Sequence, residues 1–110
     1  MEIIERFEHG MCTFALSGRV DTEGAIELDR ALQTAVSEGR YKIVLDMAEV
    51  LYISSAGLRT LADIVVKSRA GGGDLKLVAL SPKVMRVFRI IGFDRFFSIY
   101  DGIEEALDDF

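Results

Sequence analysis

From residue 21 onward, runs of apolar residues at helical spacing alternate with short β-rich runs, and this order constrains the fold more than any other feature. The first helical run covers residues 21–39, the second follows Gly57, and the third begins at Ser81-Pro82. Strand-like runs at residues 41–47 and 75–80 separate these helices. Such alternation is typical of an α/β domain whose parallel strands are joined by right-handed crossovers.

Two further strand-like runs, residues 3–8 and 11–17, precede the alternation, and His9-Gly10 between them suits a tight hairpin. A short strand at residues 97–100 and a helical turn or two at residues 103–107 complete the pattern. We therefore expect a mixed sheet of four to five strands, with an N-terminal antiparallel hairpin and about four packed helices.

The strand at residues 41–47 has an unbroken Ile-Val-Leu centre, which predicts a central strand covered on both faces. The segment that follows it, residues 48–57, is apolar and ends in small residues. We expect this segment to form a buried turn that leads from the central strand into the second helix.

The length of 110 residues fits one domain, residues 1–110, and half of the residues are hydrophobic, which is enough for a core. The single cysteine, Cys12, cannot form an internal disulfide, and the N-terminus lacks the pattern of an export signal. No apolar run approaches the roughly 20 residues that cross a bilayer. We expect a soluble cytoplasmic protein without membrane association.

The 13 basic and 18 acidic side chains give a net charge of −5, which disfavours nucleic acid as a partner. One histidine and one cysteine cannot form a zinc site. Asp46 near a strand end suggests an aspartyl phosphate receiver, but such a site needs further carboxylates after the first strand of a parallel sheet. We expect no metal and no cofactor.

A serine nucleophile is disfavoured by the residues around Ser54 and Ser55. A nucleophile elbow needs glycine two positions before the serine, where this chain has Tyr52 and Ile53. The only histidine, His9, lies in the expected hairpin turn, so a base for the serine exists only if the fold brings the two together. These residues therefore disfavour a serine-dependent enzyme unless the fold brings His9 to one of the serines.

Ser54 and Ser55 nevertheless occupy a chemically favourable position, at the start of the helix after the central strand. The N-terminus of a helix offers unpaired backbone N–H groups and a positive dipole end, which stabilise a phosphate. The simpler interpretation is that one serine only caps the helix. Gly57 within the first turn is a poor helix former and indicates a close approach there or tight packing.

The block Leu45 to Leu58, with Ser55-Ala56-Gly57-Leu58 at its end, resembles the STAS domain family, especially the bacterial anti-sigma factor antagonists. The resemblance extends along the chain. Gly18-Arg19-Val20-Asp21, Ser81-Pro82 and the segment Gly92 to Leu107 are similar to motifs of the same family.

The resemblance implies a partner switch without catalysis by the chain itself. The unphosphorylated antagonist would bind an anti-sigma factor that is also a serine kinase, and so release a sigma factor. The kinase would phosphorylate the antagonist, and a PP2C-type phosphatase would reverse this. By the family pattern Ser55 is the phosphoacceptor. Ser54 is the second choice because it replaces the usual Asp, and Ala56 stands where Ser or Thr is frequent.

The expected partner surface surrounds the acceptor and extends along the exposed side of the second helix; it comprises Asp21, Ser54, Ser55, Ala56, Gly57, Arg59 and Asp63. A basic face on the third helix, Lys83, Arg86 and Arg89, extends this surface. A constitutive STAS scaffold in a transport or other signalling complex is the alternative function. We expect a monomer or a weak homodimer.

Overall fold

In the computed structural model, which describes residues 1–110, the chain opens with the expected hairpin. Strand β1 (Glu2–Glu8) pairs antiparallel with β2 (Met11–Val20) across a two-residue turn. Both turn residues have positive φ, 53° at His9 and 76° at Gly10. Two positive φ values are what a type I′ hairpin turn requires, and histidine and glycine both tolerate them.

The remaining strands run parallel to β2 in a single sheet of order β1-β2-β3-β4-β5, so β3 is central as predicted. Their bounds are β3 (Lys42–Ile53), β4 (Asp74–Val78) and β5 (Ser98–Tyr100). Five helices connect or follow the strands: α1 (Thr22–Ser37), α2 (Ser55–Ala70), α3 (Pro82–Ile91), α4 (Phe93–Phe96) and α5 (Ile103–Asp108). The α/β prediction is confirmed.

The extra helix, α4, arises because Gly92 ends α3 in the left-handed conformation, with φ of 81°, and the chain then makes one more helical turn. Phe93 of α4 and Phe97, which follows the helix, pack against Phe88 of α3 at ring-centroid distances of 5.9 and 5.8 Å. This aromatic cluster packs α4 against α3 beside β5.

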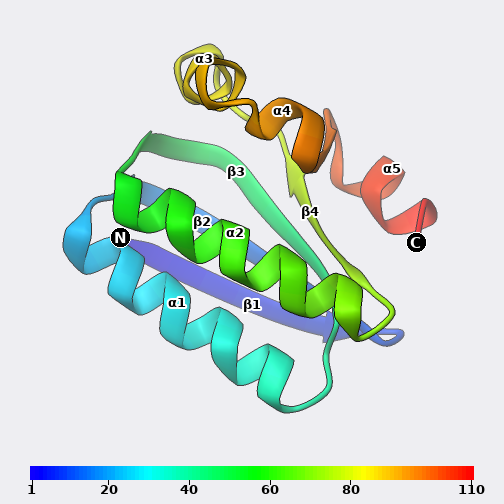
Figure 1. Ribbon diagram of the computed structural model, residues 1–110. Coiled ribbons are helices and arrows are strands. Elements are labelled where there is room, and N and C mark those ends of the chain that lie inside the picture. The colour runs from blue at the N-terminus through cyan, green and yellow to red at the C-terminus, as the bar shows by residue number, and fades with distance from the viewer.

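Helices α1 and α2 lie side by side on one face of the sheet (Figure 1). The main core forms between them and the sheet, from alternate residues of β2 and the inner stripes of both helices: Cys12, Phe14, Leu16, Leu28, Leu32, Leu61 and Ile64. Full burial of each large apolar side chain contributes about 1.5–3 kcal/mol. This layer holds α1 and α2 against the sheet.

Helix α5 covers the opposite face over β3, β4 and β5, where Val44, Val78 and Ala106 form a small second core. Lys76 is almost fully buried there, and its Nζ donates a hydrogen bond to the carbonyl oxygen of Ala106 at 2.8 Å. Burial lowers the pKa of Lys76 below its ordinary value. The part of this face formed by β1 and β2 has no helix over it.

The prediction of a buried turn at residues 48–57 is wrong. Strand β3 continues past Asp46, where its pairing with β4 ends, and pairs with β2 alone as far as Ile53. Side chains of this extension lie on both faces: Val50 and Ile53 are buried, whereas 64% of Leu51 is exposed. The long β2 strand supplies the backbone partners that make this extension possible.

Candidate functional site

The site is built where β2 and β3 end side by side, because Val20 pairs with Ile53 in the last register position of the two strands. Immediately after these residues the backbone N–H of Ser54 donates a hydrogen bond to the carbonyl oxygen of Val20 at 2.8 Å. Helix α1 begins after Asp21 and helix α2 after Ser54. Two helix N-termini therefore lie next to each other at this end of the sheet (Figure 1).

The two serines have different roles in this geometry. Ser54 is the N-cap of α2, and its Oγ accepts a hydrogen bond from the backbone N–H of Gly57 at 3.2 Å. Ser55 is the first residue of the helix; it is exposed, and its hydroxyl makes no hydrogen bond within the chain. Only the Ser55 hydroxyl is both accessible and unoccupied.

Gly57 is buried, and its lack of a side chain is a packing requirement. A Cβ at this position would lie 2.8 Å from Cγ1 of Val20 and 2.9 Å from Cγ1 of Ile53. The glycine therefore lets the first turn of α2 sit directly on the ends of β2 and β3. Of its neighbours, Ala56 is half-buried and packs against the core.

Asp21 lies at the same end of the sheet, in the neighbouring strand-to-helix connection as expected. It caps α1, with its Oδ1 accepting a hydrogen bond from the backbone N–H of Gly24 at 2.8 Å. The residue is exposed, so its carboxylate adds negative charge beside the start of α2. The structure thus brings Asp21, Ser54 and Ser55 together at the end of the sheet where β2 and β3 finish.

The two predicted residues further along α2 differ from each other. Arg59 is exposed, makes no ion pair, and lies one turn after Ser55 on the same side of the helix. Asp63 lies about 12 Å along the axis from Ser55. It accepts a hydrogen bond from Nε2 of Gln33 in α1 at 2.7 Å and pairs with Lys67 at 3.1 Å.

The hydrogen bond from Gln33 is the main reason that the pKa of the Asp63 carboxyl lies below its ordinary value, and the neighbouring Lys67 lowers it further. This carboxylate therefore links α1 to α2. The carboxylate oxygens of Asp63 can accept further hydrogen bonds from a partner.

Three exposed residues next to the site were missed by the sequence prediction. Leu51 and Tyr52 are exposed residues of the β3 extension, and the guanidinium of Arg19 stacks 4.4 Å from the centroid of the Tyr52 ring. The signal that would have found Leu51 and Tyr52 is the β-rich composition of residues 50–53, which favours continuation of the strand over a turn.

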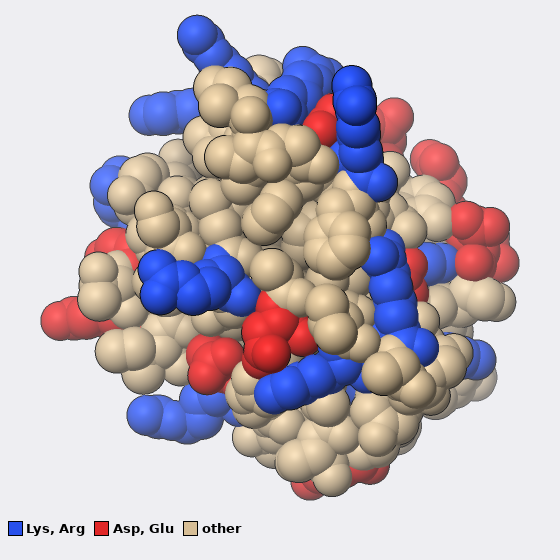
Figure 2. All heavy atoms as spheres, in the orientation of Figure 1, with Lys and Arg blue, Asp and Glu red and all other residues tan.

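The basic face of α3 is present as expected: Lys83, Arg86 and Arg89 are all exposed, and none forms an ion pair. Figure 2 shows basic side chains gathered over α3, whereas acidic side chains gather over α5 at the right of the same view. The exposed face of α3 also carries Ile90, which is 73% exposed.

The residues weighed for catalysis do not assemble. His9 lies in the hairpin turn, at the opposite end of β2 from Ser54 and Ser55. The Asp46 carboxylate accepts a hydrogen bond from the backbone N–H of Ala48 at 3.1 Å. The chain contains no group of three or more His, Cys, Asp or Glu side chains that could hold a metal ion. None of its helices combines the length and the apolar character needed to cross a membrane.

Comparison with known proteins decides the family, because the sequence model of the STAS domain matches residues 2–106. The chain belongs to the STAS domain family. A protein of Bordetella bronchiseptica named as an anti-sigma factor antagonist, BtrV, is 37% identical to this STAS domain over 97 residues, which are 88% of this chain and 84% of BtrV.

Solved structures of STAS proteins have the same fold. An anti-sigma factor antagonist of Thermotoga maritima superposes with a TM-score of 0.92 at 25% identity, covering 97% of this chain and 92% of the other. SpoIIAA of Bacillus in its phosphorylated form superposes with a TM-score of 0.79 at 19% identity, covering 98% of each chain. The predicted STAS fold is confirmed, and its antagonists are regulatory binding proteins rather than enzymes.

Proposed function

We propose that this STAS domain, residues 1–110, is an anti-sigma factor antagonist of the cytoplasm. In its unphosphorylated form it binds an anti-sigma factor that is also a serine kinase, and the sigma factor is released. The family match and the similarity to BtrV support this function. A PP2C-type phosphatase restores the binding form after the kinase has phosphorylated Ser55.

The observation that carries the proposal is the exposed and unoccupied hydroxyl of Ser55 at the start of α2. Ser54 is a poorer acceptor because phosphorylation of its Oγ would disturb the cap that this atom provides to Gly57. A phosphate on Ser55 would lie at the positive end of the α2 dipole, and Arg59 follows one turn later as a potential counter-ion. We therefore expect phosphorylation to leave the fold of the domain unchanged.

Release of the partner then follows from charge at the interface. Phosphorylation adds about −1.5 to −2 charges at neutral pH. It adds them beside Asp21, to a chain whose net charge is already −5. A loss of only about 1.4 kcal/mol in binding free energy lowers affinity tenfold. A local change of charge is thus sufficient to eject a partner whose interface covers Ser55.

The surface that such a partner covers includes the predicted residues of α2 and the residues that the β3 extension adds. Leu51, Tyr52 and Arg19 supply exposed apolar and cationic contacts beside Ser55. The basic face of α3 lies on the helix that follows β4 and extends the surface for an acidic partner region.

Phosphotransfer tests the proposal. The purified chain is incubated with its cognate anti-sigma factor kinase and ATP, and the modified residue is located by peptide mass spectrometry. We expect one phosphate, on Ser55, that is lost in Ser55→Ala. Ser54→Ala is the matched control: it retains phosphorylation but loses about 1 kcal/mol of stability with its cap. Phosphate on another residue, or none, contradicts the switch, and binding without phosphorylation would favour the constitutive scaffold.

A further inference from the structure

Strand β1 forms one outer edge of the sheet, since β2 is its only strand partner. No second strand pairs with its outer side, so half of its backbone N–H and C=O groups lack a strand partner. Four of its seven residues are charged. Between the charges lies Ile4, which is 53% exposed although it is a large apolar residue.

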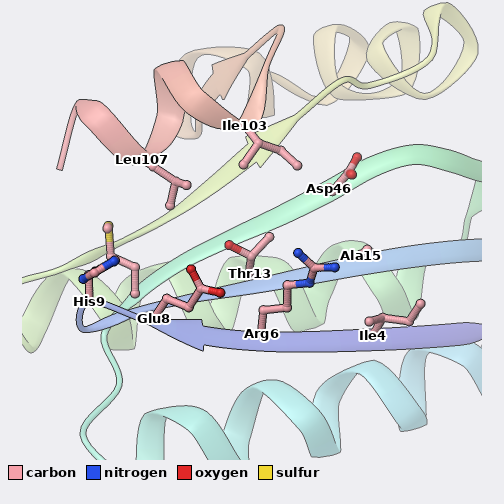
Figure 3. Close-up of a pocket in the computed structure, with 10 residues that line it drawn as sticks. Ile4, Arg6, Glu8, His9, Thr13, Ala15, Asp46, Ile103 and Leu107 are labelled. Carbon is pink, nitrogen blue, oxygen red and sulfur yellow. The ribbon is translucent and has the colours of Figure 1, made fainter.

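The side chains of β1 form two rows, as in any strand. Figure 3 shows Ile4, Arg6 and Glu8 on the face that α5 does not cover over β1 and β2, where a groove of about 400 Å³ runs between the strands and α5. Glu2 belongs to the same row by alternation and pairs with Ser17 of β2. Neither Glu2 nor Arg6 forms an ion pair within the chain, and both are exposed.

We propose that two copies of this chain associate by antiparallel pairing of β1 with β1 of the second copy, centred on Ile4. Each Glu2 then lies opposite Arg6 of the other copy, so the contact contains two equivalent ion pairs. The two Ile4 side chains meet on the two-fold axis between them. The outward backbone groups of β1 gain hydrogen-bond partners, and one continuous sheet crosses both molecules.

The sequence of β1 selects this register. A two-fold axis between antiparallel edge strands keeps α1 and α2 of both copies on the same side of the joined sheet, so the axis passes through a residue paired with its own copy. If the axis passes through Glu5, this residue opposes itself and Glu2 opposes Glu8. If it passes through Arg6, two guanidinium groups meet. Like charges directly opposite each other oppose pairing.

The other two registers are too short. An axis through Ile3 or through Phe7 pairs only three residues of β1 from each copy, whereas the axis through Ile4 pairs five, from Glu2 to Arg6. The register on Ile4 is therefore the longest one without a like-charge pair. The charged residues, which protect an edge strand against general aggregation, here permit one specific partner.

This dimer leaves the candidate partner site open. Edge β1 lies on the side of β2 away from β3, and Ser55 follows the end of β3. Each dimer would therefore present two separate Ser55 sites. The proposed dimer does not depend on the phosphorylation of Ser55, because it forms at the outer edge of β1, whereas Ser55 follows the end of the central strand β3.

Sedimentation velocity of the full chain from micromolar to millimolar concentration tests the dimer. We expect reversible dimerisation of the parent chain. Arg6→Glu and Glu2→Arg each turn both ion pairs into like-charge pairs and should weaken association about tenfold or more. The double variant Glu2→Arg/Arg6→Glu restores both pairs and should recover the parent affinity. Glu8→Gln, outside the paired segment, is the control and should leave the affinity unchanged.

Three results overturn the proposal: a parent chain that stays monomeric throughout this range, a dimer that Arg6→Glu leaves intact, or a dimer that Glu8→Gln strengthens, since that result indicates the register on Glu5. Circular dichroism of each variant verifies folding, which exposed positions should not disturb. Hydrogen exchange gives an independent readout. The outward amides of β1 should become more protected as protein concentration rises, and unchanged protection also contradicts the dimer.

Discussion

The backbone N–H of Ser54 donates a hydrogen bond to the carbonyl oxygen of Val20 at 2.8 Å, and this bond fixes the start of α2 beside the start of α1. It connects the ends of two parallel strands immediately before their helices begin. As a consequence Asp21, two helix N-termini and the free hydroxyl of Ser55 share one small region of the surface. This arrangement makes a local change of charge at Ser55 effective.

Asp21→Asn separates the charge of this residue from its structural role. Asparagine caps a helix about as well as aspartate, so the free energy of unfolding should change by less than about 0.5 kcal/mol. With Ser55 phosphorylated, the variant should bind the kinase several-fold more tightly than the phosphorylated parent, because one repulsive charge is removed. Titration calorimetry measures both affinities. Glu27→Gln, further along α1, is the control, and equal affinities for phosphorylated parent and Asp21→Asn contradict the role of Asp21.

Gly57→Ala should destabilise the domain even though alanine is the better helix former. The added Cβ would meet Val20 and Ile53 at under 3.0 Å, and overpacking of this kind costs about 1–3 kcal/mol. Denaturant unfolding measures the loss. Gly102→Ala is the matched control, because a Cβ there would meet nothing closer than 3.8 Å. A stable Gly57→Ala variant would contradict the close approach of α2 to the strand ends.

The alternation of strands and helices could be predicted because each element has its own pattern and end signals: Ser81 caps α3, and Pro82 stands at its first position. The extended conformation of residues 48–53 could not be predicted, because it depends on pairing with β2, whose length is determined by other residues of the chain. Local propensity alone does not show which strands remain paired.

The candidate site was predictable in position but not in detail. The family pattern leads to Ser54 and Ser55, and only the structure shows that the Ser54 hydroxyl oxygen is used by the cap. In the same way, the hydrogen bond between Asp63 and Gln33 joins residues from two helices that sequence spacing does not place together. Contacts of this kind follow from packing.

Ser68→Ala should stabilise the domain. Ser68 is fully buried in α2, and its hydroxyl has no hydrogen-bond partner. A buried hydroxyl without a partner costs about 1–3 kcal/mol, so its removal should raise the free energy of unfolding by about 1 kcal/mol. Thermal and denaturant unfolding measure the gain. Ser37→Ala, at an exposed position, should stay within about 0.5 kcal/mol of the parent, and a loss of stability in Ser68→Ala would show that the hydroxyl has a partner.

Alkaline stability should depend on Tyr100. Its phenol donates a hydrogen bond to Asp109, and this bond, together with burial, raises the pKa of Tyr100 from 10.0 to about 12. The folded chain therefore keeps a proton that the unfolded chain loses. The stabilisation is fully present below pH 10 and is lost as the pH rises to about 12. Tyr100→Phe should remove this part of the pH dependence. The measurement is the free energy of unfolding of the parent and of Tyr100→Phe as a function of pH from about 9 to 12. Parallel curves across this window contradict the prediction.

The affinity of the chain for its kinase before and after phosphorylation of Ser55 tests the central claim most directly. The account predicts that phosphorylation weakens binding at least about tenfold, while circular dichroism and the melting temperature show an unchanged fold. Equal affinity of the phosphorylated and unphosphorylated chains would contradict it.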